Sequence, residues 1–376
     1  MSADVDSARR ETPLEAKLKA QIRREGPIGV DVYMEACLDD PEHGYYRRQP
    51  AIGAAGDFVT APEISQVFGE LIGLWCAVVW RQMGSPARLN LVELGPGRGT
   101  LMRDALRAAR IVPEFRAALA LHLVDSNATL RAVQTETLAD AGVHIELHDA
   151  VEVLASDAHV PAGPTVVIAN ELLDALPVAQ HVFVDGDWRA RTVAVGDDGD
   201  LCFKPAPDRR ARPAWLPADR APREGDILET CAGHGTFAKV LGARAALGPL
   251  AALFIDYGHA ATGYGDTLQG VAGQAHVSPF HAPGETDLSA QVDFQHFAGA
   301  CREAGLAVDG PVPQAEFLGR LGIVERASRL MAANPARGAE IEAGVGRLIA
   351  PSGMGSRFLA LGVRSPDVAP LPGFEG

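Results

Sequence analysis

The sequence predicts an α/β protein built around a Rossmann-like, mostly parallel sheet. Its 376 residues are enough for one large core with insertions or for two lobes. From residue 89 to residue 170, short apolar runs typical of buried strands alternate with segments of helical periodicity, as in parallel strands joined by crossover helices. Polar residues follow several of these runs. Ligands of such sheets bind beyond the carboxyl ends of the strands, so we expect a site there.

The best-defined stretch is the turn from the first core strand into a helix. Leu89 to Leu94 form an apolar strand, and leucine, methionine and alanine recur at helical spacing from Thr100. Glycine between them permits positive φ and lets a ligand approach the helix N–H groups closely. The spacing is G-x-G-x-G rather than the G-x-G-x-x-G of dinucleotide sites, and Glu93 precedes it. A carboxylate here suits a cationic ligand group; the alternative is a tight turn without a ligand. The three glycines are Gly95, Gly97 and Gly99.

Acidic and amide residues follow the later strands as well. Asp125, Asp149 and the pair Asn170-Glu171 each come directly after an apolar run of strand type. A carboxylate at the end of the second strand is where a ribose-binding acid is found in related folds. Because the carboxyl ends of parallel strands share one edge of a sheet, we expect these residues to face one ligand.

The remaining elements can be assigned in chain order. A long loop rich in glycine and proline covers residues 39–65 and is either functional or a packed covering segment. Helices are expected at 13–22, 30–38, 64–83, 128–141, 231–247, 294–304 and 314–334. Strands are expected at 119–124, 143–147, 165–169, 250–255, 306–308 and 358–363, and short strands with a hairpin at Asp185-Gly186 occupy 178–203.

These elements suggest a division of the chain into segments. We expect a disordered tail over 1–12 and a helical N-terminal segment with a pocket-covering loop over 13–85. The core would span 86–365, with insertions near 178–225 and 257–290, and a second tail would occupy 366–376.

Composition excludes several classes of function. The formal net charge of −14 opposes a nucleic-acid-binding surface. Five cysteines without C-x-x-C spacing indicate a reduced compartment and no metal site. The apolar stretch from Val67 to Trp80 contains Glu70 and is too short to span a bilayer, and residues 1–19 lack an apolar signal core. We therefore expect a cytoplasmic protein without stable membrane insertion.

Eight motifs resemble the mitochondrial complex I assembly methyltransferase family, also called the mitochondrial dysfunction protein A family. The resemblance spans about residues 14–363, and the motifs read DPEHGYY, GDFVTAPEIS, FGELIGLW, ELGPGRGTLM, ANELLDALP, DYGH, PGETDLSAQVDF and MGSRFLALGV. The resemblance implies a class I S-adenosylmethionine-dependent methyltransferase with a seven-stranded sheet. It further implies symmetric dimethylation of an arginine on a protein such as a respiratory complex I subunit. No transit peptide is recognisable, which suggests a bacterial relative whose target could differ.

The resemblance also implies roles for particular residues. The methyl donor, S-adenosyl-L-methionine, would contact Glu93, Gly95, Gly97, Gly99, Asp125, Ser126, Asp149, Ala150 and Asn170. The acceptor arginine would be held by Glu171 together with Asp57, Glu63 or Asp174. Each of the last three has a plainer explanation: Asp57 could shape a turn, Glu63 could be a first-turn acid of a helix, and Asp174 could cap a helix.

Two other functions remain open from the sequence. A nicotinamide-dependent oxidoreductase uses a similar sheet, but the glycine spacing and Glu93 disfavour it. A non-catalytic assembly factor could retain the cofactor fold for binding alone. His259 and His281 are either acid–base groups or structural histidines. The sequence assigns neither an oligomeric state nor a metal.

Overall fold

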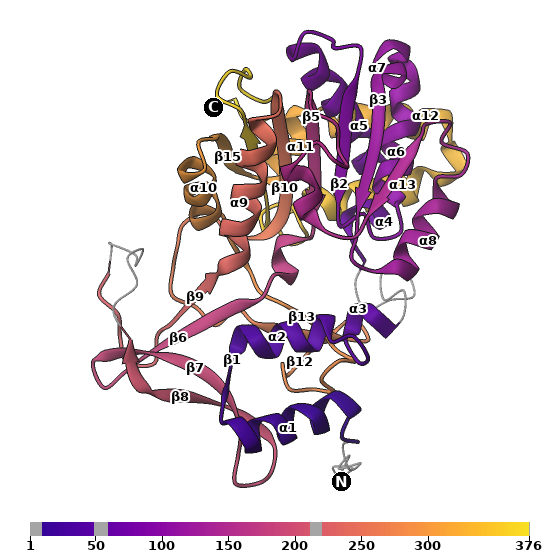
Figure 1. Cartoon of the computed structure of the whole chain (residues 1–376). Coiled ribbons are helices and arrows are strands. Elements are labelled where there is room, and N and C mark those ends of the chain that lie inside the picture. Colours follow the sequence, from indigo (N-terminus) through magenta and orange to yellow (C-terminus); the bar gives the residue numbers. More distant parts are fainter. Residues whose placement is uncertain (1–9, 49–58, 211–219, 376) are drawn as a thin grey trace. The chain divides into compact units, whose positions relative to one another are not determined.

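The computed structural model describes residues 10–48, 59–210 and 220–375, and the chain forms two compact units (Figure 1). The first unit contains Met1–Ala51, Ala175–Ala232 and Gly263–Ala290. The second contains Ile52–Asp174, Gly233–Thr262 and Gln291–Gly376. In the described ranges, no helix is both long and apolar enough to cross a membrane.

The second unit is built on a seven-stranded sheet with the order β15-β16-β10-β5-β2-β3-β4. The pairs from β10 to β4 are parallel, and only β16 runs against its neighbours β10 and β15. A short additional strand, β14, pairs with the end of β10. The predicted seven-stranded, mostly parallel sheet is therefore confirmed. The strands are β2 (Leu89–Leu94), β3 (Leu119–Val124), β4 (Ile145–His148), β5 (Thr165–Asn170), β10 (Leu250–His259), β14 (Val292–Asp293), β15 (Ala307–Pro313) and β16 (Phe358–Arg364).

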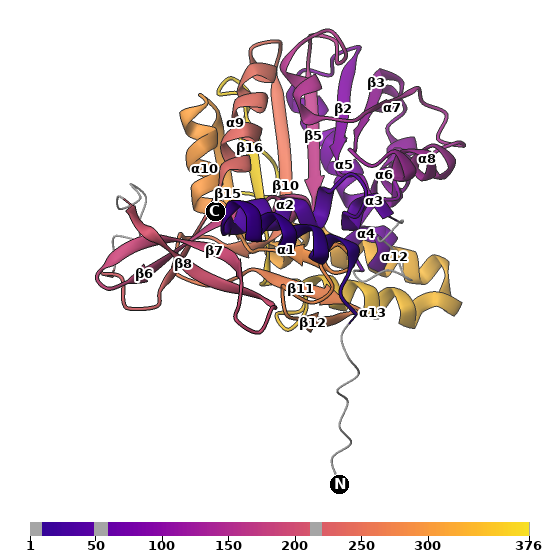
Figure 2. The ribbon, with the colours of Figure 1, turned by 60° about the horizontal axis from the view of Figure 1, so that its bottom comes forward.

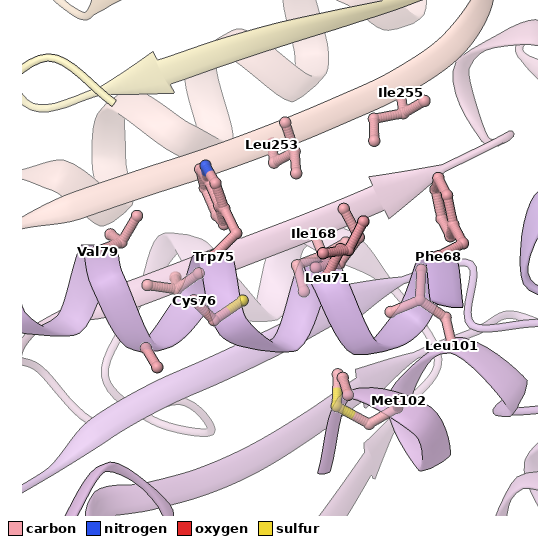
Figure 3. Packing of buried hydrophobic residues seen from close by; sticks show 14 of the residues in the cluster. Phe68, Leu71, Trp75, Cys76, Val79, Leu101, Met102, Ile168, Leu253 and Ile255 are labelled. Carbon is pink, nitrogen blue, oxygen red and sulfur yellow. The ribbon is translucent and has the colours of Figure 1, made fainter. Parts of the chain in front are cut away.

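Helices cover both faces of this sheet because its strands carry apolar side chains in both directions. On one face, Trp75 of α5 packs in a cluster that includes Leu253 of β10 and Ile168 of β5 (Figure 3). On the other, Phe254 of β10 meets Phe297 of α10 edge to face, with ring centroids 4.8 Å apart. The helices are α4 (Ala61–Ile64), α5 (Gln66–Gln82), α6 (Thr100–Ala108), α7 (Pro113–Ala118), α8 (Ala128–Thr137), α9 (Ala232–Ala245), α10 (Phe294–Glu303), α11 (Gln314–Arg320), α12 (Ile323–Ala333) and α13 (Gly338–Ile349). Short 3-10 helices occupy Ala109–Ile111, Val151–Ala155, Leu173–Ala175 and Pro335–Arg337.

The first unit combines helices with two antiparallel sheets, which are visible from below in Figure 2. Its core joins Tyr33 and Met34 of α2 to Val193 of β7. The predicted hairpin at Asp185-Gly186 is present, and both residues have positive φ, at 54° and 77°. The helices are α1 (Pro13–Glu25), α2 (Val30–Asp39) and α3 (Tyr45–Arg48). The strands are β1 (Ile28–Gly29), β6 (Val178–Val184), β7 (Asp187–Val195), β8 (Leu201–Arg210) and β9 (Ile227–Cys231) in one sheet, and β11 (Gln269–Ala272), β12 (Ala275–Val277) and β13 (Asp287–Ser289) in the other.

Two predicted helices are each divided in the structure. The helix expected at 64–83 breaks at Ser65, which is extended and accepts a hydrogen bond from Val67 N through its side chain, so that it caps α5. The helix expected at 314–334 breaks at Gly322, the residue directly before α12, whose φ of 82° is in the left-handed region.

Helix α13 was not predicted. Its glycines obscure an apolar repeat whose buried residues are Ile341, Val345 and Leu348. The strands β11, β12 and β13 within 263–290 were not predicted either.

Replacing Trp75 by alanine tests the packing of α5 on the sheet. Trp75 is 1 % exposed, and its indole N–H donates to Pro372 O at 3.0 Å. We expect the free energy of unfolding to fall by about 3–5 kcal/mol, because a large buried ring is removed. Val78→Ala on the same helix is the control: this side chain is 44 % exposed, and we expect a change within about 0.5 kcal/mol. Equal losses in chemical denaturation would contradict this packing.

Candidate functional site

The glycine turn after β2 has the backbone conformation that the sequence predicted. Gly95, Gly97 and Gly99 have φ values of 63°, 52° and 79°. A Cβ at Gly95 would lie only 2.8 Å from Leu172 Cδ1. Side chains other than hydrogen would therefore be strained at this turn and would crowd its neighbours. The turn leads into α6, and its residues Gly95, Pro96 and Gly97 line a pocket.

A pocket opens at this turn, and segments far apart in the sequence line it. The strand β2 contributes Glu93, and the end of β5 contributes Asn170 and Glu171. From the N-terminal side come Thr60 and the start of α4 with Glu63. The structure thus brings together six of the predicted site residues: Glu63, Glu93, Gly95, Gly97, Asn170 and Glu171.

Glu93 is a buried carboxylate with an unused acceptor atom. The residue is 3 % exposed, and among the residues that the structure describes none donates a hydrogen bond to its Oε2. Burial, assisted by the nearby charge of Asp125, raises the pKa of Glu93 to about 8. Asn170 Oδ1 is likewise buried without a partner in the described ranges. Two unpaired acceptors in one pocket favour a ligand that carries N–H donors.

Glu171 is held in one orientation by the backbone and by two donors. Its φ of 52° is left-handed, which is strained for a residue with a side chain. Its N–H donates to Ile255 O at 2.9 Å, and its Oε1 accepts from Ala61 N at 2.9 Å and from Asn170 Nδ2 at 3.0 Å. Burial raises the pKa of Glu171 to about 7 in spite of these donors. No donor in the described ranges reaches Oε2, so this oxygen can receive a substrate group.

Glu63 is both a helix residue and part of the pocket lining. It is a first-turn acid of α4, and it also lines the pocket, where its Oε1 accepts a hydrogen bond from the Thr100 hydroxyl. Glu63, Glu93 and Glu171 therefore line one pocket, in which Arg98 is the only cationic side chain of the described lining. A second, polar cavity shares Pro62, Glu63 and Thr100 and continues to α13.

The other predicted cofactor residues, all of them in the described ranges, do not line this pocket. Asp125 lies at the end of β3, and its Oδ2 accepts a hydrogen bond from Gln134 Nε2, which also donates to Gly97 O, each at 2.9 Å. Four further residues lie outside the lining: Gly99, Ser126, Asp149 and Ala150. Of these, Ser126 and Asp149 are exposed.

Two of the predicted acceptor residues have a different status. Asp174 lies inside the single 3-10 turn Leu173–Ala175, so the expected helix that it might cap is not formed. Its side chain does not line the pocket. Asp57 falls outside the residues that the structure describes.

Asp256 is a positioning residue that is not among the site residues predicted from the sequence. It is 1 % exposed, and its Oδ2 accepts hydrogen bonds from the N–H groups of Leu172, Leu173 and Asp174 at 3.0, 2.8 and 3.2 Å. Its Oδ1 accepts from Tyr257 N at 2.9 Å. Burial and the adjacent charge of Glu171 raise the pKa of Asp256 above the usual carboxyl range. The DYGH motif at the end of β10 was the available signal.

The strand order, the glycine turn and the acidic pocket are features of S-adenosyl-L-methionine-dependent methyltransferases. A family model described as "Putative S-adenosyl-L-methionine-dependent methyltransferase" matches residues 71–312. The mitochondrial protein arginine methyltransferase NDUFAF7 of Mus musculus is 35 % identical over 368 residues, which cover 92 % of this chain and 83 % of the relative. The protein of the same name from Homo sapiens is 34 % identical over 367 residues, 92 % of this chain and 82 % of that one.

A solved structure agrees with these relatives. A protein from Burkholderia thailandensis bound to S-adenosyl-homocysteine matches with a TM-score of 0.81 and 28 % identity, covering 96 % of this chain and 92 % of that one. The chain belongs to this family of S-adenosyl-L-methionine-dependent methyltransferases, together with the NDUFAF7 proteins. The predicted family, enzyme class and methyl donor are confirmed, and the oxidoreductase alternative is not supported.

The raised pKa of Glu93 predicts a pH dependence of stability. An unfolded glutamate has a pKa near 4.5, so between pH 4.5 and about 8 the folded protein retains a proton that the unfolded chain releases. The Glu93 contribution to the free energy of unfolding therefore falls as pH rises, by about 1.4 kcal/mol per pH unit. Glu93→Gln removes this contribution and is otherwise similar in size. Chemical denaturation from pH 6 to pH 8 should show the wild type losing stability relative to the variant; parallel curves would contradict the buried, protonated carboxyl.

Proposed function

We propose that the protein transfers methyl groups from S-adenosyl-L-methionine to an arginine of a protein substrate. The observation that carries the proposal is that two glutamates line one pocket. Glu93 has an Oε2 that accepts no hydrogen bond from the described residues, and Glu171 is held in one orientation. One carboxylate suits the ammonium of the methyl donor, and the other suits a guanidinium. The relatives named as protein arginine methyltransferases support this assignment.

The order of polar residues along the sheet edge supports an extended orientation of the methyl donor. The ammonium would donate to Glu93 and Asn170, with Gly95, Gly97 and Gly99 behind the amino-acid part. Neighbouring strands lie about 4.8 Å apart, so the ends of β2, β3 and β4 succeed one another over roughly 10 Å. Asp125 with Ser126 would then take the ribose hydroxyls, and Asp149 with Ala150 would contact adenine. The three strands are hydrogen-bonded neighbours in this order.

The acidic pocket can orient the guanidinium of the substrate arginine and shield this cation from water. When bound, the methyl donor supplies an electrophilic methyl carbon on a sulfonium, and transfer is an in-line displacement. Glu171 Oε2 would accept hydrogen bonds from the guanidinium and aim one nitrogen at that carbon. The pKa of Glu171 is raised to about 7, so in the empty pocket the carboxyl is partly protonated at neutral pH. The positive charge of a bound guanidinium would lower this pKa and favour the carboxylate form of Glu171. Glu63 is the better-supported second partner, since its carboxylate lines the same pocket.

A second cavity supports a substrate larger than a free amino acid. It begins at Pro62, Glu63 and Thr100, which it shares with the pocket, and extends to Arg337 and Glu340. A peptide carrying the target arginine could lie there.

We propose a respiratory complex I subunit as the substrate and the bacterial cytoplasm as the location. Mass spectrometry of that subunit, from cells with and without this protein, should show methylarginine only when the protein is present. An unmodified subunit in both would contradict the assigned substrate, and methyl transfer to no protein in a lysate would favour a non-catalytic assembly factor.

Replacing Gly97 by valine tests the cofactor side of the proposal. A β-branched side chain at a φ of 52° would project from the turn that backs the amino-acid part of the donor. We expect S-adenosylhomocysteine to bind at least about tenfold more weakly, a loss of about 1.4 kcal/mol, in calorimetric titration. Gly186→Val is the matched control, since Gly186 also has positive φ and open space around it in the β6–β7 hairpin. Unchanged affinity in Gly97→Val would remove the loop from the cofactor site.

Replacing Glu171 by glutamine tests the acceptor side. The neutral amide keeps the shape but loses the charge that orients the guanidinium, so we expect kcat to fall by about 100-fold or more. The affinity for S-adenosylhomocysteine should change less than about threefold. Glu114→Gln, an exposed position on α7, should leave both quantities unchanged. Wild-type turnover in Glu171→Gln, measured as radioactive methyl transfer to a protein substrate, would exclude this residue from the chemistry.

A further inference from the structure

A cluster of histidine and glutamate side chains lies on neighbouring strands β3 and β4, away from the pocket lining. The two strands are parallel with His122 opposite Glu146 and Val124 opposite His148. Side chains two residues apart on a strand share one face of the sheet, so His122, Glu146 and His148 meet on the same face. His122 Nδ1 lies 3.1 Å from His148 Nε2 and 3.7 Å from Glu146 Oε2.

These three groups offer ligand atoms that lie within 4.8 Å of one another. Two imidazole nitrogens and one carboxylate oxygen are a ligand set of Zn²⁺ and similar divalent transition metals, whereas Mg²⁺ and Ca²⁺ prefer oxygen alone. The rings are also available to a metal, because burial lowers the pKa of His122 to about 4 and lowers that of His148. Both rings are therefore neutral near pH 7.

The burial of the cluster is graded. The His122 side chain is fully buried and fixed within the sheet, whereas the Glu146 side chain is 37 % exposed and His148 is partly exposed. An ion could therefore enter from the side of Glu146 and His148 and meet a pre-oriented inner ligand. His159 is a neighbour that could approach a further coordination position, since its ring centroid is 6.2 Å from that of His148.

We propose that His122, Glu146 and His148 form a binding site for a zinc-type divalent transition metal that bridges β3 and β4. The competing explanation is a direct hydrogen bond between two neutral rings, which a metal would replace. Within the described sheet β4 is an edge strand that pairs only with β3, so a metal bridge would fasten it to the core. The residues after β4 are Asp149 and Ala150, so the bridge would also stabilise that end of the strand.

Titration of the full-length, untagged protein with Co²⁺ tests this site. After removal of metals with a chelator, we expect one equivalent to bind with the visible absorption of a protein-coordinated ion, and Zn²⁺ to displace it. His148→Ala and Glu146→Ala should each weaken binding at least about tenfold, with folding checked by circular dichroism. His276→Ala, an exposed histidine on β12, should bind like the wild type. A ligand bound only by the folded state must raise its stability, so Zn²⁺ should also raise the Tm of the wild type but not that of His148→Ala.

The same titration can contradict the proposed metal site. Absence of saturable one-to-one binding would leave the direct hydrogen bond between the rings as the explanation. Equal affinity in His148→Ala and the wild type, or a loss in His276→Ala as large as in His148→Ala, would mean that binding occurs at other histidines. Metal binding is measured without methyl donor or protein substrate, so these outcomes do not depend on the methyltransferase activity.

Discussion

The candidate active site depends on one buried carboxylate that organises a backbone turn. Asp256, at the end of β10, accepts hydrogen bonds from three consecutive N–H groups after β5. These bonds hold the chain directly after Glu171, whose backbone is in a left-handed conformation that an isolated glutamate would rarely adopt. The hydrogen bonds to Asp256 compensate for this strained backbone conformation. They thereby fix the side chain of Glu171 beside the glycine turn. Without Asp256, three N–H groups, that of the buried Leu173 among them, would lose their acceptor.

Electrostatics connects this geometry to the chemistry. Burial disfavours the charged forms of Glu93 and Glu171, which raises both pKa values toward or above neutrality. A pocket with such carboxylates gains most from ligands that bring positive charge, because each ligand restores the ionised form and satisfies an unused oxygen. The proposed reaction offers an ammonium, a sulfonium and a guanidinium. In that reaction, transfer would remove the charge on sulfur, so these carboxylates would hold the spent donor less tightly.

Sequence patterns predicted much of this architecture because its signals are local. The positive φ values at Gly95, Gly97 and Gly99 follow from glycine spacing, and the parallel sheet follows from apolar runs separated by helical segments. Features that depend on distant partners could not be predicted. The hydrogen bonds that Asp256 accepts from Leu172, Leu173 and Asp174 span more than 80 residues. The His122–His148 contact requires the register between β3 and β4. The break at Ser65 was missed because its side-chain cap competes with an otherwise continuous helical pattern.

The central claim concerns where the methyl donor lies, and a crystal structure with S-adenosylhomocysteine tests it most directly. The account predicts that the amino group of the ligand lies within hydrogen-bond distance of Glu93 Oε2 and Asn170 Oδ1. It also predicts that the sulfur lies at the glycine turn and faces Glu171. A ligand bound elsewhere, or one whose amino group points away from Glu93 and whose sulfur is remote from Glu171, would contradict the account.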